Sequence, residues 1–116
     1  MPAKRLSADL SASAPVFAAL GDATRLRLVA RLSGGQPKSI SQLSAGAAVT
    51  RQAITKHLHV LAEAGLVRGH KQGREQMWEL QPRQIQEARR RLDWIAQQWD
   101  GALARLKLMV EEDSPG

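Results

Sequence analysis

The stretch TRQAITKHLHVLAEAGL, residues 50–66, decides how the rest of this chain can fold. On a helix at about 100° per residue, Ile54, Leu58 and Leu61 fall on one apolar arc. Six polar side chains share the opposite arc: Arg51, Gln52, Thr55, Lys56, His59 and Glu63. We therefore predict an amphipathic helix that turns one face toward a core and the other face outward.

Both ends of this predicted helix carry residues that stop it. The Thr50 hydroxyl can accept an unpaired backbone N–H of the first turn, and Gly65 readily adopts the left-handed conformation that closes the last turn. The outer face suits nucleic acid, because Arg reads guanine edges, Gln reads adenine, and Thr, Lys and His bind phosphate or base oxygens. A solvated surface helix also has a polar face, so the context must decide between the two interpretations.

The chain is basic, with a net charge of +6 and an isoelectric point near 10.8. A basic surface favours an anionic partner, above all nucleic acid; a membrane surface is less favoured, because no segment joins a basic face to a strongly apolar one. No apolar run approaches membrane-spanning length, and without cysteine there is no disulfide or thiolate metal site. We expect a cytoplasmic protein of one domain.

The residues before this stretch predict an arm and two short helices. Residues 1–13 are small, polar and without period, which indicates a flexible arm. A helix is predicted from Pro15 to Leu20, and a second one from Ala23 to Leu32, with Asp22 as its cap. Arg25 lies on the core face of the second helix, where an arginine is usually a paired structural charge.

A short strand at residues 38–40 and a small helix at 42–45, capped by Ser39 or Ser41, follow a glycine-rich turn. Gly46 then allows a tight turn into the helix that begins after Thr50. A small helix, a turn with glycine and a second amphipathic helix together form a helix-turn-helix.

After Gly65 the apolar period changes from 3.6 residues to about 2. Residues 66–71 and 75–80 flank Gln72-Gly73-Arg74, which predicts a β-hairpin with two cations near its tip, Lys71 and Arg74. A hairpin in this position is the wing of a winged helix-turn-helix.

A long helix is predicted from Arg83 to Val110, because Pro82 stops the preceding strand and opens a helical turn. Its apolar stripe is continuous: Ile85, Ala88, Leu92, Ile95, Trp99, Leu103, Leu106 and Val110. The stripe is longer than the preceding helices and hairpin can cover. Part of the stripe is therefore expected to be buried against a second chain. The residues expected in this dimer interface are Leu92, Ile95, Trp99, Leu103 and Leu106.

The predicted fold is mainly α with a small β-hairpin, a dimeric winged helix-turn-helix. Its element order is helix, helix, strand, helix, helix, strand, strand, helix. We assign the DNA-binding and dimerisation domain to residues 14–112, the flexible arm to 1–13 and a flexible tail to 113–116.

These segments resemble the ArsR-type winged-helix repressors of bacteria and archaea. In the order and spacing of that family the chain has FAALGDATR (17–25), SISQL (39–43), AITKHL (53–58), LAEAGLV (61–67) and the wing pair Gly73-Arg74. The resemblance covers roughly residues 15 to 82. The segments LDWI (92–95) and WDGAL (99–103) resemble a Trp-bearing subgroup whose terminal helix contributes to a homodimer.

The resemblance implies that Arg51, Gln52, Thr55 and Lys56 face the major groove, and that the hairpin faces the minor groove or the backbone. Many members of the family leave DNA when a metal ion binds. Their ligands are a Cys-x-Cys-type site on the small helix, or Asp and His on the terminal helix. This chain has no cysteine and no histidine on its terminal helix. We therefore expect no metal site and no cofactor, and an inducer, if one exists, that is not a metal ion.

No pattern in the sequence supports an enzyme. His57 and His59 are two residues apart on a helix and cannot chelate one ion, and no catalytic triad or phosphate-binding glycine loop is present. His57 is expected to be a structural, hydrogen-bonded residue, whereas His59 either contacts DNA or is solvated. The run Arg89-Arg90-Arg91 is expected to be a solvated face, with phosphate contact as the alternative.

We therefore predict a sequence-specific regulator of transcription that binds double-stranded DNA. We expect a homodimeric repressor of its own or adjacent genes, acting on a palindromic operator with half-sites about one helical turn (34–36 Å) apart. The alternative is a winged-helix protein–protein interaction module without DNA readout. The residues expected to contact DNA are Ser39, Ser41, Thr50, Arg51, Gln52, Thr55, Lys56, His59, Lys71 and Arg74.

Overall fold

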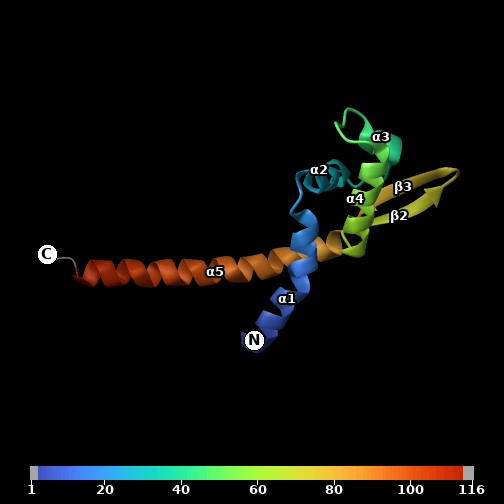
Figure 1. The fold of residues 1–116 in the computed structure, drawn as a ribbon. Coiled ribbons are helices and arrows are strands. Elements are labelled where there is room, and N and C mark those ends of the chain that lie inside the picture. The colour runs from blue at the N-terminus through green and yellow to red at the C-terminus, as the bar shows by residue number, and fades with distance from the viewer. Residues whose placement is uncertain (1–2, 114–116) are drawn as a thin grey trace.

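The computed structural model describes residues 3–113 and contains the predicted order of helices and strands (Figure 1). The elements are α1 (Ala3–Leu20), α2 (Ala23–Leu32), β1 (Lys38–Ser39), α3 (Ile40–Ser44), α4 (Arg51–Glu63), β2 (Val67–Gln72), β3 (Glu75–Leu80) and α5 (Pro82–Asp113). This arrangement is mainly helical with one small antiparallel sheet, so the predicted winged helix-turn-helix is confirmed.

The central helix α4 has the caps that the sequence predicts. The Thr50 hydroxyl accepts the backbone N–H of Ala53 at 3.1 Å. At the other end Gly65 has a φ of +77°, and the N–H of Leu66 donates to the carbonyl of Leu61 at 2.9 Å. This is the Schellman arrangement, which satisfies carbonyls that the last turn would otherwise leave unpaired. The helix therefore ends where the wing must begin.

The core lies between α1, α2, α3, α4 and the base of the wing. The apolar arc of α4 is sealed inside it, with Ile54 1% exposed and Leu58 and Leu61 0% exposed. The other helices and the sheet supply the remaining buried apolar side chains: Val16, Ala19, Leu28, Leu32, Leu43, Leu66, Val67, Trp78 and Ala88. Burial of these side chains fixes the orientation of α4, and with it the direction of its outer face.

The sheet has the strand order β1-β3-β2, with both pairs antiparallel. Gln72 pairs with Glu75, so the loop of the hairpin is the two residues Gly73 and Arg74, one fewer than predicted. Gly73 has a φ of +65°, and no other residue of this loop has a positive φ. Glycine at the first loop position is typical of a type II′ turn, whose twist matches that of the two strands.

The start of the first helix differs from the prediction. We predicted a flexible arm up to residue 13 and a helix from Pro15, but α1 already begins at Ala3 and Pro15 lies inside it. Proline costs a helix one backbone hydrogen bond. Here the cost is offset because Ser13 and Val16, on either side of it, are buried against the body. The two predicted termini lie partly outside the described residues, which exclude 1–2 and 114–116.

The last helix gives the molecule its length. The molecule measures 72 × 32 × 21 Å, and its radius of gyration is 19.9 Å, against about 13 Å for a compact chain of this size. α1 crosses the first part of α5, and the C-terminal half of α5 runs free of the body (Figure 1). α5 ends at Asp113, three residues beyond the predicted end. Among the described residues, no helix is long and apolar enough to span a membrane.

Candidate nucleic-acid interface

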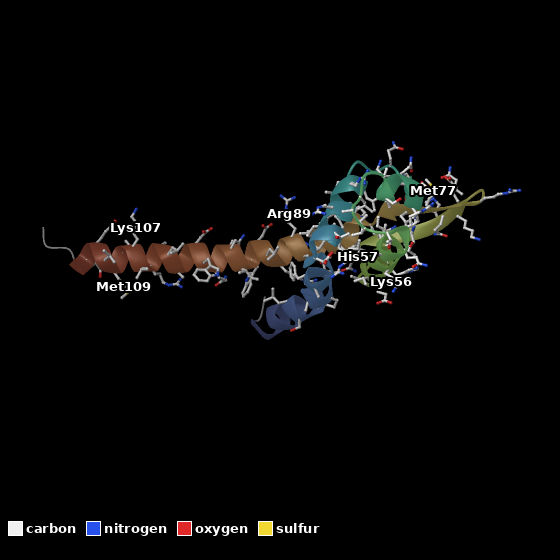
Figure 2. The ribbon with its side chains drawn as sticks, turned by 45° about the horizontal axis from the view of Figure 1, so that its top comes forward. Lys56, His57, Met77, Arg89, Lys107 and Met109 are labelled. Atoms are coloured by element: carbon white, nitrogen blue, oxygen red, sulfur yellow. The ribbon has the colours of Figure 1, made fainter. Side chains whose placement is uncertain are left out.

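The outer face of α4 presents the polar side chains that the sequence singled out. Arg51, Gln52 and Lys56 are exposed, and Thr55 is half-buried between them. Figure 2 shows Lys56 on the body of the molecule, far from Lys107 near the end of α5. The Thr55 hydroxyl donates to the carbonyl of Arg51 at 2.9 Å. Its proton is thus committed to the helix, and its lone pairs and its methyl group remain for a ligand.

Helix α3 holds the first of these side chains in place. Arg51 Nη2 donates to the Ser41 hydroxyl at 2.9 Å across the helix-turn-helix. A guanidinium held in this way is oriented before any ligand arrives, so less conformational entropy is lost when it binds. Ser41 is therefore connected to the interface through Arg51, and both residues are exposed.

Ser39 is more buried than the other residues predicted to contact DNA. It is 7% exposed, and its hydroxyl accepts the N–H of Gln42 at 3.2 Å, while the Gln42 side chain accepts the N–H of Ser39 at 2.8 Å. This reciprocal capping box starts α3 and uses the Ser39 hydroxyl as an acceptor, although Ser39 also borders the groove between the helix-turn-helix and the wing. Ser39 therefore has a structural role at the start of α3. Thr50, the cap of α4, differs from it in being exposed.

A groove of about 250 Å³ joins the helix-turn-helix to the wing. Ser41 and Arg51 line it on one side, and Arg74 and Gln76 line it on the other. Ile40 and Ser39 also line the groove, and Ile40 borders the outer face of α4 as well. Helix, turn and wing therefore form one continuous surface.

Three residues of this groove, Ile40, Glu75 and Gln76, were not among those predicted from the sequence. Ile40 was assigned to a short strand, and its place on the surface follows only from the packing of α3 against α4. Gln76 lies opposite Lys71 in the hairpin, so the strand register could have indicated it. Lys71 and Arg74 are both exposed, as expected for cations near the tip of a wing.

His59 joins α4 to the wing. Its ring meets the ring of Trp78 edge-on, with 5.6 Å between the centroids. Trp78 in turn lies over Gly69, the residue opposite it on the neighbouring strand, where an added Cβ would approach the indole to 3.0 Å. His59 is exposed. It is therefore positioned by an aromatic contact, an arrangement that neither of the two sequence-based alternatives included.

His57 is a structural residue, as predicted. Arg25 Nη1 lies 3.2 Å from His57 Nδ1, and Arg25 Nε donates to the carbonyl of Ala19 at 2.5 Å. A guanidinium can only donate, so His57 Nδ1 accepts and the imidazole carries its proton on Nε2. The backbone N–H of Arg25 donates to Asp22 at 3.0 Å and lowers the pKa of that carboxyl. This network fixes α4 against the end of α1 and the start of α2.

The charged side chains between Asp22 and Glu63 are all positive. The 40 residues between Asp22 and Glu63 contain no Asp or Glu. They contain six cations: Arg25, Arg27, Arg31, Lys38, Arg51 and Lys56. Glu75, next to Arg74 on the wing, is the acidic residue that borders the groove. A surface of this kind attracts a polyanion and raises its rate of association.

The apolar stripe of α5 leaves the body at Leu92, where it becomes exposed. Leu92 is 49% exposed, Trp99 65%, and Leu103 and Leu106 each 56%. Ile95 is half-buried. These are the five residues predicted to contact a second chain, and in four of them about half or more of the residue's surface is exposed.

The described residues contain no cluster of three or more His, Asp or Glu side chains with the geometry to hold a metal ion. The Asp22–His57 pair, 3.9 Å apart, is bonded instead through Arg25.

Comparison with known proteins agrees with this geometry. Residues 20–70 match a family model described as a helix-turn-helix domain. The chain is 32% identical over 95 residues to the HTH-type transcriptional regulator Rv2034 of Mycobacterium tuberculosis, covering 82% of this chain and 85% of that protein.

Two solved structures resemble the fold closely. An ArsR-like transcriptional regulator from Rhodococcus sp. RHA1 is 38% identical, with a TM-score of 0.72, covering 85% of this chain and 92% of that one. A possible transcriptional regulator for arsenical resistance is 34% identical, with a TM-score of 0.62 and coverages of 84% and 94%. With its capped recognition helix, its wing and its cationic face, the chain belongs to the ArsR-type family of winged helix-turn-helix transcriptional regulators.

Proposed function

We propose that this DNA-binding regulator acts as a homodimeric repressor on a palindromic operator, with α4 of each copy in a major groove. The observation that carries the proposal is the continuous surface from Arg51 and Lys56 of α4, past Ser41, to Arg74 of the wing. A major groove admits one helix, and a wing beside that helix reaches the flanking backbone or minor groove.

The side chains of this surface divide by chemistry. Arg51 and Gln52 extend from the first turn of α4 and can each make a bidentate contact, so we assign them to base edges. Lys56 is a point charge one turn further along, suited to a phosphate. Lys71 and Arg74 at the wing are assigned to the backbone or the minor groove. Arg51 is already oriented by Ser41.

The exposed stripe on α5 supports the dimer. Leu92, Trp99 and Leu106 are seven residues apart, and Ile95 and Met109 keep the intervening register. Apolar residues repeated in this way form the seam of a pair of helices. A second copy of the same face satisfies the stripe by two-fold symmetry, and it also gives the molecule two recognition helices.

The test of DNA readout compares the protein on the promoter of its own gene with its binding to random DNA. Gln52→Ala should weaken binding to the promoter fragment by about 1–3 kcal/mol and leave random DNA unaffected. Gln86→Ala removes another exposed glutamine, on α5, and is the matched control. An equal loss of affinity for both DNAs would indicate that Gln52 contacts the DNA backbone. Equal wild-type affinity for both DNAs would favour the interaction module without readout.

We also propose that metal ions do not regulate the protein. The chain has no cysteine, and α5 has no histidine, so the ligand sets of the metal-releasing members are missing. Zinc, arsenite or cadmium at micromolar concentration should leave operator affinity unchanged. A stoichiometric complex that lowers the affinity would contradict this.

A further inference from the structure

A cavity of about 270 Å³ lies between α2 and the turn that connects α3 to α4. The apolar side chains of Leu28, Leu43 and Ile54 line it together with the backbone of residues 46–49. Thr24 and Arg27 of α2 also line it. The cavity is separate from the groove that joins α4 to the wing, and none of its lining residues was assigned to DNA.

The charges at this cavity are all positive. Arg27 and Arg31 are four residues apart on α2, so they point to the same side. Arg31 is committed to the turn, because its Nη1 donates to the carbonyls of Leu43 at 2.8 Å and Ala45 at 3.3 Å. In the described part of the chain, the guanidinium of Arg27 has no hydrogen bond and no ion pair. None of the Asp and Glu side chains that the structure describes lines the cavity.

We propose that this cavity binds a small organic anion, with its carboxylate at Arg27 and its apolar body against Leu28, Leu43 and Ile54. The apolar lining favours such a molecule over inorganic phosphate, because phosphate has no apolar group to pack against that lining. The volume is just below the range of about 300–1,000 Å³ that drug-sized ligands occupy. It suits a monocarboxylate of medium chain length.

The cavity wall is the turn that begins the recognition helix. Gly46 has a φ of +72°, and the residues after it are small and exposed: Ala47, Ala48 and Val49. One backbone hydrogen bond, from Ala47 to Ser44 at 3.0 Å, and the two bonds of Arg31 hold this turn. A ligand beneath the turn shifts the start of α4 and places a negative charge beside it. Both effects oppose the approach of DNA phosphates, so the anion weakens DNA binding. By linkage, DNA weakens binding of the anion by the same factor.

The binding site is tested without DNA, using octanoate as the probe and octanol as its uncharged match. In ¹⁵N-resolved NMR, octanoate should give saturable shifts of the amides of Gly46 to Val49, and octanol should bind at least about tenfold more weakly. Arg27→Gln should weaken octanoate by about tenfold or more, and Arg27→Lys should restore part of the affinity. Arg89→Gln, an exposed arginine on α5, should leave octanoate binding unchanged.

Three results would overturn the site. These are no saturable shift in the turn, shifts confined to the exposed stripe of α5, and octanoate binding that is unchanged in Arg27→Gln while affinity for random DNA falls. The last result would make Arg27 a backbone contact for DNA.

The regulatory step rests on the proposed function and has its own measurement. Saturating octanoate should lower the affinity of the wild-type protein for its promoter fragment, and it should do so less in Arg27→Gln. Octanoate that binds without changing DNA affinity would overturn the regulatory step. If the unliganded protein does not bind DNA at all, the proposed function fails, but the NMR titration still decides whether the site exists.

Discussion

The recognition helix α4 and the terminal helix α5 carry the same kind of apolar stripe, but their own chain covers all of the first and only the start of the second. On α4, Leu58 and Leu61 are 0% exposed, whereas on α5 Trp99 is 65% and Leu106 56% exposed. Both helices are amphipathic by spacing alone. The periodicity of a helix therefore shows that a face must be covered, but it does not show what covers it.

The difference lies in what surrounds each helix. α4 is enclosed by α1, α2, α3 and the base of the wing, and its ends are closed by Thr50 and by Gly65. α5 meets α1 over its first turns and then leaves the body (Figure 1). Stability of α4 should thus be a property of one chain, and stability of the outer half of α5 a property of two.

The largest effect is expected from a substitution in the buried apolar stripe of α4. Leu58→Ala should lower the free energy of unfolding by about 2–5 kcal/mol, because it leaves a cavity in the core. Urea denaturation measures the loss, which should not change with protein concentration. Val60→Ala is the control on the same helix. Val60 is 39% exposed, so this variant should lose little free energy of unfolding. Similar losses for the two variants would show that α4 is not sealed in solution.

The exposed stripe should give a smaller effect that depends on concentration. Leu106→Ala should weaken the dimer by about 1.5–3 kcal/mol per buried leucine, and sedimentation equilibrium measures this as a shift toward monomer. Leu108→Ala is a close match, because Leu108 is 59% exposed, but it lies off the stripe. Wild-type protein that sediments as a 12.7 kDa monomer at micromolar concentration would contradict the dimer.

The polar faces of the two helices can be compared in the same way. Lys56→Gln on α4 should weaken binding to any duplex and shallow the dependence of log affinity on log salt by about 1. Arg89→Gln on α5 should change neither, because we expect a solvated face there. A change of slope in both variants would extend the DNA interface onto α5.

The smallest effect concerns the network that holds α4 in place. Asp22→Ala should lower the melting temperature slightly, because the first turn of α2 loses its cap, and Asp22→Asn should restore most of the loss. The pKa of Asp22 in the folded protein lies below 3.8. The advantage of the wild type over Asp22→Asn is therefore complete above that pH, and it should disappear as the pH falls through the lower value of the folded state. An advantage that is unchanged in acid would show that the charge of Asp22 contributes nothing.

Much of the fold followed from local patterns. The caps of α4, its buried arc and the hairpin were all predicted, because Thr50, Gly65 and Gly73 act within a few residues of themselves. The start of α1 was missed, because Pro15 indicates a first turn locally, whereas α1 begins at Ala3 and packs against α5 from Ser13 onward. That packing joins residues far apart in the chain, for example Ser13 and Arg91.

The candidate site was predicted less completely than the fold. The exposed side chains of α4 and the wing cations were selected from the sequence, but the burial of Ser39 depends on its capping box with Gln42. The bond from Arg51 to Ser41 and the contact of His59 with Trp78 also join elements whose relative positions only the packed structure defines. Whether these residues contact DNA stays a prediction.

The length of α5 also sets a scale for the operator. Gln84 packs over Gly65, so the end of α4 is anchored at the first turns of α5 (Figure 1). When two copies pack antiparallel through the stripe, each residue between Gln84 and their crossing point separates the two recognition helices by about 3 Å more. A crossing near Ile95 gives half-sites roughly one helical turn of DNA apart, and a crossing near Lys107 gives roughly two. The separation of the two half-sites therefore depends on where the two copies of α5 cross. A footprint that measures the half-site spacing would locate the two-fold axis along α5.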